Sequence, residues 1–250
     1  MLTNPSDTIC PLCQKNTPLI KSHIIPEFMY KGIYDASGKY LALAGQLTDS
    51  RVSGHSFFGT KGANEGMLCK DCDNNVIGSR IEEPAKSIIE KIRGLSSSPP
   101  LQLMKVDYKL FKLFQLSILW RVSLSNNPLF KKAALPEKHI SRMRDMLVAE
   151  DPGPYYQYGC IMFTFPKDNV LNRTMVDTRS GRWNGHTIIH VSSPGLRFLF
   201  VVSSHTKQFA QKVGFLQEDG TLPIAVAPRE VVESELSELA FIVKNTPPNS

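Results

Sequence analysis

An α+β fold is predicted for this chain of 250 residues by two helical patterns in its middle and a strand-rich pattern after them. Apolar residues recur at helical spacing over 105–125, wide enough around the helix to place it in a core. A second helical pattern covers 137–150 and ends at Pro and Gly residues. The alternating pattern that follows predicts antiparallel strands at 159–165, 173–177, 187–191 and 196–203.

Composition excludes several classes of protein. Hydrophobic residues make up 42% of the chain and charged residues 21%, close to globular averages, which excludes a wholly disordered or collagen-like chain. No apolar run approaches the ~20 residues that a membrane-spanning helix needs. The first residues lack a basic segment followed by an apolar one, as a secretory signal has. We therefore expect a cytoplasmic protein without membrane association.

The positive charge is concentrated in the middle of the chain. The net charge is +6, and residues 96–212 hold 16 Lys and Arg against 7 Asp and Glu. Such an excess suits binding of a polyanion such as DNA or RNA, and it equally suits an ordinary soluble protein with a basic pI. Arginines among the predicted strands leave the same alternatives, a phosphate-binding face or a solvated one: Arg173, Arg179, Arg182 and Arg197.

Four of the five cysteines form two Cys-x-x-Cys pairs, Cys10 with Cys13 and Cys69 with Cys72. Two such pairs predict a tetrahedral structural zinc site, in which each pair sits on a tight turn. A thioredoxin-like redox pair would need a βαβ setting, which the surrounding sequence does not show. The remaining cysteine, Cys160, lies in an apolar strand pattern and is expected to be a buried thiol.

The chain divides at a Ser- and Pro-rich stretch over 96–100, which has the composition of a linker. We predict a zinc module over 1–95 and an α+β region over 105–245 that binds substrate or a partner. The last residues, 246–250, have the composition of a disordered tail.

Three polar residues lie between or beside the cysteine pairs: His23, Asn64 and Asp73. His23 stands in Ser-His-Ile-Ile-Pro over 22–26, an apolar run with polar residues at its edge. Most isolated histidines in such runs are structural. Proximity to a metal turn and the position of Asp73 directly after Cys72 favour a functional site here.

This order of motifs resembles the HNH endonuclease family, and more narrowly bacterial HNH-type proteins with a Ser-His-Ile-Ile-Pro box. The resemblance is specific over roughly 10–90, and 108–121 also resembles the helix that follows the nuclease in that group. It implies a treble-clef-like ββα-metal module, a structural Zn²⁺ and a catalytic Mg²⁺ or Mn²⁺. It further implies hydrolysis of phosphodiester bonds, in DNA, by a protein that can serve with a partner in a bacterial anti-phage system.

By position, the resemblance makes His23 the general base and Asn64 the residue that orients it, and it makes Asp73 a ligand of the catalytic cation. The family usually has aspartate or histidine before the base, whereas this chain has Ser22. The cation would then depend on Asp73 or on other candidate donors: Asn74, Asn75, Glu82, Glu83 and His55. The alternative is a zinc-stabilised nucleic-acid-binding or interaction subunit without catalysis.

Overall fold

The structure is a computed structural model. It describes residues 9–30, 33–34, 36–48, 51–60, 62–95, 98–166, 169–203, 206–210 and 213–244. The predicted tail over 246–250 lies outside these residues. Within them, no helix combines the length and apolar character that crossing a bilayer requires.

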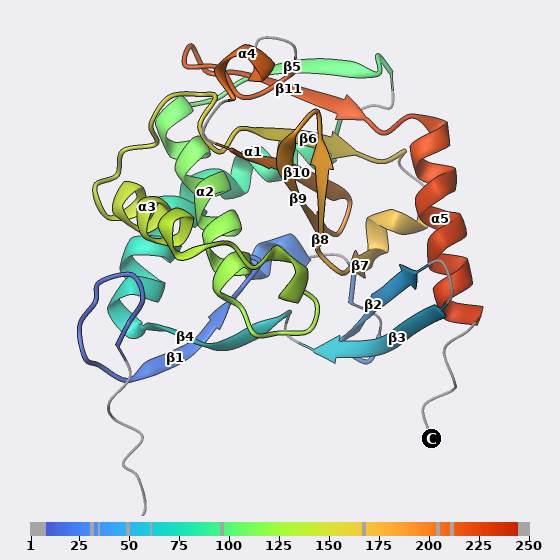
Figure 1. The fold of residues 1–250 in the computed structure, drawn as a ribbon, viewed down its shortest axis with the longest axis horizontal. Helices are drawn as coiled ribbons and strands as arrows, with labels where there is room; N and C mark the ends of the chain where they lie inside the picture. Colours follow the sequence, from blue (N-terminus) through green and yellow to red (C-terminus); the bar gives the residue numbers. More distant parts are fainter. Residues whose placement is uncertain are drawn as a thin grey trace, which may run out of the picture.

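The helices and strands intermix along the chain, which confirms the predicted α+β class (Figure 1). The helical elements are η1 (Glu27–Tyr30), η2 (Cys72–Glu82), α1 (Glu83–Arg93), α2 (Tyr108–Leu124), η3 (Lys131–Ala133), α3 (Glu137–Val148), η4 (Val170–Arg173), α4 (Lys207–Ala210) and α5 (Arg229–Lys244). The strands are β1 (Leu19–His23), β2 (Lys39–Thr48), β3 (Arg51–Thr60), β4 (Asn64–Cys69), β5 (Leu101–Lys105), β6 (Cys160–Thr164), β7 (Thr174–Val176), β8 (Arg179–Trp183), β9 (His186–Ser193), β10 (Leu196–Val202) and β11 (Thr221–Val226).

The described strands form three sheets. The largest has the order β5-β11-β6-β10-β9-β8 and is antiparallel except for the parallel pair of β11 and β6. A second sheet has the order β3-β2-β7, in which β2 and β7 run parallel although they come from opposite sides of the predicted linker. The third is the antiparallel pair of β1 and β4.

Helix α2 lies at the centre of the core. Every residue from Phe111 to Ser123 is buried, so the helix is covered on all sides rather than along one stripe. It contacts η2, α1 and α3, and one cluster of buried side chains joins Cys10 and Cys72 to Trp120 and Phe198. Side chains before and after the predicted linker therefore pack together.

The sequence placed the start of α2 too early. It begins at Tyr108 because the carboxylate of Asp107 accepts a hydrogen bond from Leu110 N and caps the helix. Residues Leu101–Lys105 instead form β5, which pairs with β11.

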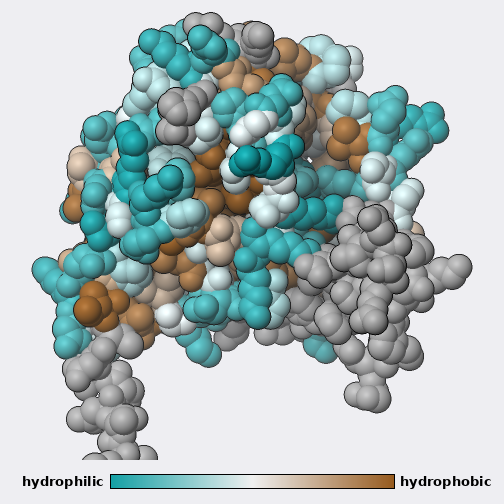
Figure 2. Space-filling model, viewed as in Figure 1, coloured by the Kyte–Doolittle hydropathy of each residue, from teal (hydrophilic) through white to brown (hydrophobic). Residues whose placement is uncertain are grey.

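Much of the molecular face seen in Figure 2 is hydrophilic, and hydrophobic residues are visible between the hydrophilic ones near its centre.

Candidate functional site

The two Cys-x-x-Cys pairs meet in space. The four sulfur atoms all lie within 4.8 Å of one another; they belong to Cys10, Cys13, Cys69 and Cys72. The Cys13 and Cys69 sulfurs are 3.9 Å apart. A tetrahedral site with Zn–S distances of about 2.3 Å has sulfur–sulfur edges of about 3.8 Å. All four cysteines are free thiols, and three of them are buried. The prediction that these residues form one group able to hold a metal ion is confirmed.

Local backbone hydrogen bonds shape the first cysteine turn. Gln14 N donates a hydrogen bond to Cys10 O, and Cys10 N donates one to Lys15 O. These two bonds close a tight turn over residues 10–15. Gln14 has a φ of 58°, the left-handed conformation that such a tight reversal needs. The second turn is joined to the first, because Cys69 N donates to the Cys10 sulfur at 3.5 Å.

The surroundings of the sulfurs shift the pKa values of three of these thiols in different directions. Burial opposes ionisation of Cys10, but hydrogen bonds from the backbone of Cys13, Cys69 and Leu12 outweigh it and lower its pKa. Burial raises the pKa of Cys69, and burial together with the neighbouring sulfurs raises the pKa of Cys72. A bound cation reverses this balance, because it compensates the negative charge of closely spaced thiolates.

The strand pair β1–β4 connects this metal group to His23 and Asn64. Leu19 pairs with Cys69 at one end, and His23 pairs with Asn64 at the other. The cysteine group and the His23–Asn64 pair therefore lie at opposite ends of one short antiparallel ribbon. The structure brings His23 and Asn64 together as directly opposite residues.

Ser22 helps to hold this ribbon in register. The pairing shifts between Ile20 and Lys21, so that Ile20 faces Leu68 and Lys21 faces Gly66. At this irregularity Leu68 N donates to the Ser22 hydroxyl at 3.2 Å. The Ser22 side chain is fully buried. The Ser22 hydroxyl therefore accepts the hydrogen bond of a buried backbone N–H group, that of Leu68, at this irregularity of the strand pair.

The His23 ring lies against the loop that leads into β4. Gly62 in that loop has a φ of 69°, and a Cβ there would lie 2.8 Å from the Tyr30 ring and 3.2 Å from His23 Cδ2. The Asn64 side chain donates to Gly62 O at 3.2 Å. Glycine at position 62 thus allows the backbone to approach both rings.

A buried arginine holds the His23 backbone from the other side. Arg121 Nη1 donates to His23 O at 2.7 Å, and Arg121 Nη2 lies 2.7 Å from Glu82 Oε1. Arg121 is 1% exposed, so this charge is paired inside the protein. This role of Arg121 was not predicted from the sequence, because a charged residue on a helical pattern is usually solvated.

Two of the alternative cation donors already pair with basic side chains. Glu82 pairs with Arg121, and Glu83 pairs with Lys86 at 3.8 Å. Within the described residues, the four cysteines are the only group of three or more His, Cys, Asp or Glu ligands close enough to share an ion. Asp73 and His23 are not brought into such a group. The His55 side chain lies outside the described part of the structure.

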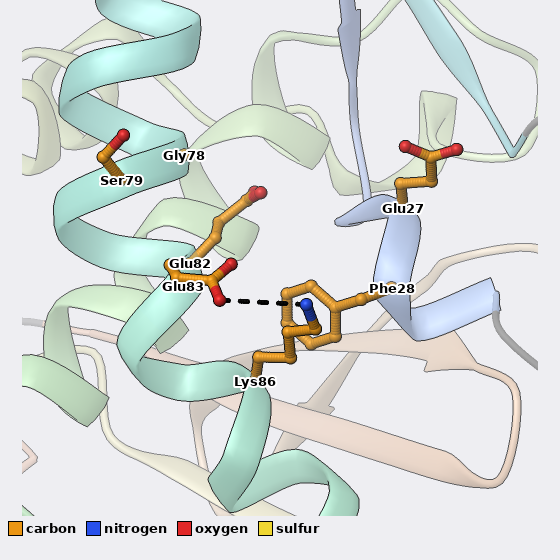
Figure 3. Close-up of a pocket in the computed structure, with 7 residues that line it drawn as sticks. All are labelled: Glu27, Phe28, Gly78, Ser79, Glu82, Glu83 and Lys86. Carbon is orange, nitrogen blue, oxygen red and sulfur yellow. Dashed lines mark ion pairs between the residues drawn. The ribbon is translucent and has the colours of Figure 1, made fainter.

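A cavity of about 370 Å³ opens beside this helix (Figure 3). Glu82 and Glu83 line it from the helix, and Glu27 and Phe28 line it from η1, which follows the Ser-His-Ile-Ile-Pro stretch. Glu82 thus joins the wall of this cavity to Arg121 and, through it, to His23.

No family model, curated protein or solved structure matches this chain.

The four arginines among the predicted strands do not form one face. Arg197 is 2% exposed, pairs with Glu235 at 2.9 Å and lies over the Phe165 ring. Arg179 and Arg182 instead line a shallow pocket on β8 with Trp183. Trp183 is 39% exposed and packs its ring edge-on against Phe209, so it borders the core.

Proposed function

We propose that the chain is an HNH-type endonuclease that hydrolyses phosphodiester bonds in DNA. The observation that carries the proposal is the pairing of His23 with Asn64 at one end of β1–β4, with the four-cysteine group at the other. A strand pair followed by a helix, with the histidine at the strand end, is the arrangement that the sequence resemblance implies.

In the proposed reaction, His23 takes a proton from the attacking water, for which an imidazole is suited near neutral pH. Asn64 orients the imidazole. Arg121 positions His23 by fixing its carbonyl oxygen, and it touches neither water nor phosphate in this scheme. The four cysteines would hold a structural Zn²⁺, which would stabilise the ribbon and the start of the helix.

A catalytic Mg²⁺ or Mn²⁺ would neutralise charge on the phosphate. Asp73 is the proposed ligand by sequence position. Because the described residues form no second ligand group, the cation in this proposal depends on additional oxygen ligands from water and the DNA phosphate, as Mg²⁺ often does.

The decisive experiment compares nicking of supercoiled plasmid by wild type and by His23→Ala in Mn²⁺ and in Mg²⁺, each with and without EDTA. Loss of the base should lower the rate by about 10²–10⁴ while the protein stays folded and keeps its zinc. His186→Gln, which changes a histidine in β9, is the matched control and should cleave like wild type. Asp73→Asn should raise the concentration of Mn²⁺ needed for half-maximal rate.

A second function is favoured by the buried Ser22 hydroxyl and by the absence of a second ligand group among the described residues. In it, the chain is a zinc-stabilised subunit that binds nucleic acid or a protein partner without cutting, for example in an anti-phage complex. Equal cleavage by wild type and His23→Ala would reject His23 as the base. No cleavage of DNA or RNA by either protein would support this second function.

A further inference from the structure

A basic cavity lies between α3 and the large sheet and shares no residue with the β1–β4 strand pair. It has a volume of about 640 Å³ and is lined from α3 by Lys138, His139 and Arg142. The facing wall comes from the segment before β6, with Tyr156 and Tyr158, and from the strand ends of β9 and β10. A volume of this size is typical of a small-molecule site, for which the usual range is about 300–1,000 Å³.

In the part of the chain that the structure describes, no carboxylate forms an ion pair with the cations of this cavity, Lys138 and Arg142. None of the residues that line it is acidic. The two acidic residues nearest in sequence on α3 are engaged elsewhere, since Glu137 accepts from Ser141 and Asp145 pairs with Arg144.

The cavity also holds neutral hydrogen-bonding groups in fixed positions. His139 Nδ1 lies 3.0 Å from the Tyr158 hydroxyl, and the amide of Gln157, in its preferred orientation, accepts from Arg142. Thr206 is anchored by its hydrogen bond to Tyr156 O at 2.6 Å. Arg142 is thus held by a neutral partner, which leaves its charge available to an anion.

Aromatic surface completes the lining. Tyr156 packs edge-on with Tyr155, with ring centroids 5.5 Å apart, so its ring is held by a neighbour. A half-buried tyrosine of this kind offers a face on which a nucleobase can stack. Positive charge at α3 and an aromatic ring across the cavity suit a ligand that carries a phosphate at one end and a planar base at the other.

We propose that this cavity binds a free nucleoside phosphate, with Lys138 and Arg142 on the phosphate and Tyr156 on the base. The site does not depend on the proposed nuclease activity, because it shares no residue with the β1–β4 ribbon. The volume of about 640 Å³ suits a mononucleotide, and a test with a short oligonucleotide distinguishes it from a continuous strand.

The test is isothermal titration of the full chain with AMP, ATP, adenosine and inorganic phosphate. AMP and ATP should bind, and adenosine should bind at least tenfold more weakly than AMP. Lys138→Gln/Arg142→Gln should weaken AMP binding at least tenfold, and both side chains are exposed enough for the variant to fold. Lys91→Gln, an exposed lysine on α1, removes a charge elsewhere and should leave the affinity unchanged.

Tyr156→Ala separates base stacking from charge, since it should weaken AMP binding while leaving the weak binding of phosphate unchanged. The proposal is overturned if neither nucleotide binds at millimolar concentration, or if the double variant binds AMP as wild type does. Binding of a short oligonucleotide without binding of AMP would also overturn it, and would assign the cavity to a nucleic-acid strand.

Discussion

Arg121 Nη1 donates a hydrogen bond of 2.7 Å to the carbonyl oxygen of His23, which lies 98 positions earlier in the chain. The same guanidinium pairs with Glu82, so one buried cation joins β1, the end of η2 and the central helix α2. A hydrogen bond to a backbone carbonyl fixes the strand end without using the imidazole. This contact therefore does not involve the His23 side chain.

We expect Arg121→Met to lower the free energy of unfolding by about 3–5 kcal/mol, because it leaves the Glu82 carboxylate and a carbonyl without their partner. Denaturant unfolding measures this change. Arg144→Met is the matched control, because Arg144 pairs with Asp145 near the surface and should lose less than about 1 kcal/mol. Arg121→Met/Glu82→Gln should be more stable than Arg121→Met alone; equal stability would show that the charge of Glu82 carries none of the cost.

The cysteine group predicts one metal ion per chain. The purified protein should contain one equivalent of zinc by elemental analysis, and a strong chelator should unfold the part of the chain around β1–β4. Cys72→Ser should lose the metal, since a neutral hydroxyl replaces a thiolate ligand. Cys160→Ser is the control, because Cys160 is buried in β6 outside the group, and its variant should keep the full equivalent.

Two results for metal content would contradict the prediction of a zinc site. If Cys160→Ser also lost metal, or if the wild type held no metal after purification without chelators, the four sulfurs would not be a zinc site. The two cysteine turns would then have to be held by their backbone hydrogen bonds alone.

The Ser22 hydroxyl predicts a structural effect rather than a catalytic one. Ser22→Ala should lower stability by about 1–3 kcal/mol, because Leu68 N loses its acceptor in a buried position. The concentration of Mn²⁺ needed for half-maximal cleavage should not change in this variant. Ser79→Ala, an exposed serine on η2, is the control and should leave stability within about 0.5 kcal/mol. A changed Mn²⁺ requirement in Ser22→Ala would instead make the hydroxyl a cation ligand.

Residue types and short spacings were sufficient to predict much of the metal site. Two Cys-x-x-Cys pairs restrict the chemistry of four side chains whatever the rest of the fold does. The strong helical pattern likewise predicted α2 and α3 to within a few residues. The family resemblance led us to expect Asn64 near His23. It did not predict that the two residues pair directly across β1 and β4, because periodicity alone does not fix which residues of two strands face one another.

The parts that the sequence did not reveal depend on long-range contacts. Strand β11 contains Pro223, which argues against a strand by local rules, yet it pairs with both β5 and β6. Gly78 does not break helix η2, because Glu83 N donates to Gly78 O five residues earlier and the helix runs on into α1. The role of Arg121 depends on partners 39 and 98 positions away in the chain.

The burial of Lys112 predicts that the free energy of unfolding rises with pH above pH 8. It lies in α2, is 1% exposed and donates to Tyr158 O at 2.7 Å. Burial lowers the pKa of Lys112 to about 8, which is below the ordinary value of an exposed lysine. Between pH 8 and the unfolded pKa near ~10.4, the unfolded chain binds more protons at this position than the folded chain does.

The contribution of Lys112 to the free energy of unfolding should therefore increase as the pH rises above 8. The increase should reach about 3 kcal/mol once the pH exceeds the unfolded pKa of about 10.4. Below pH 8 both states are protonated and the contribution is constant. Lys112→Met removes the titration, so the unfolding free energy of wild type minus that of the variant should increase from pH 7 to pH 9.5. Other groups that titrate in this range, such as the buried tyrosines, are present in both proteins and cancel in the comparison. A difference that stays constant with pH would mean that Lys112 remains charged in the folded protein throughout.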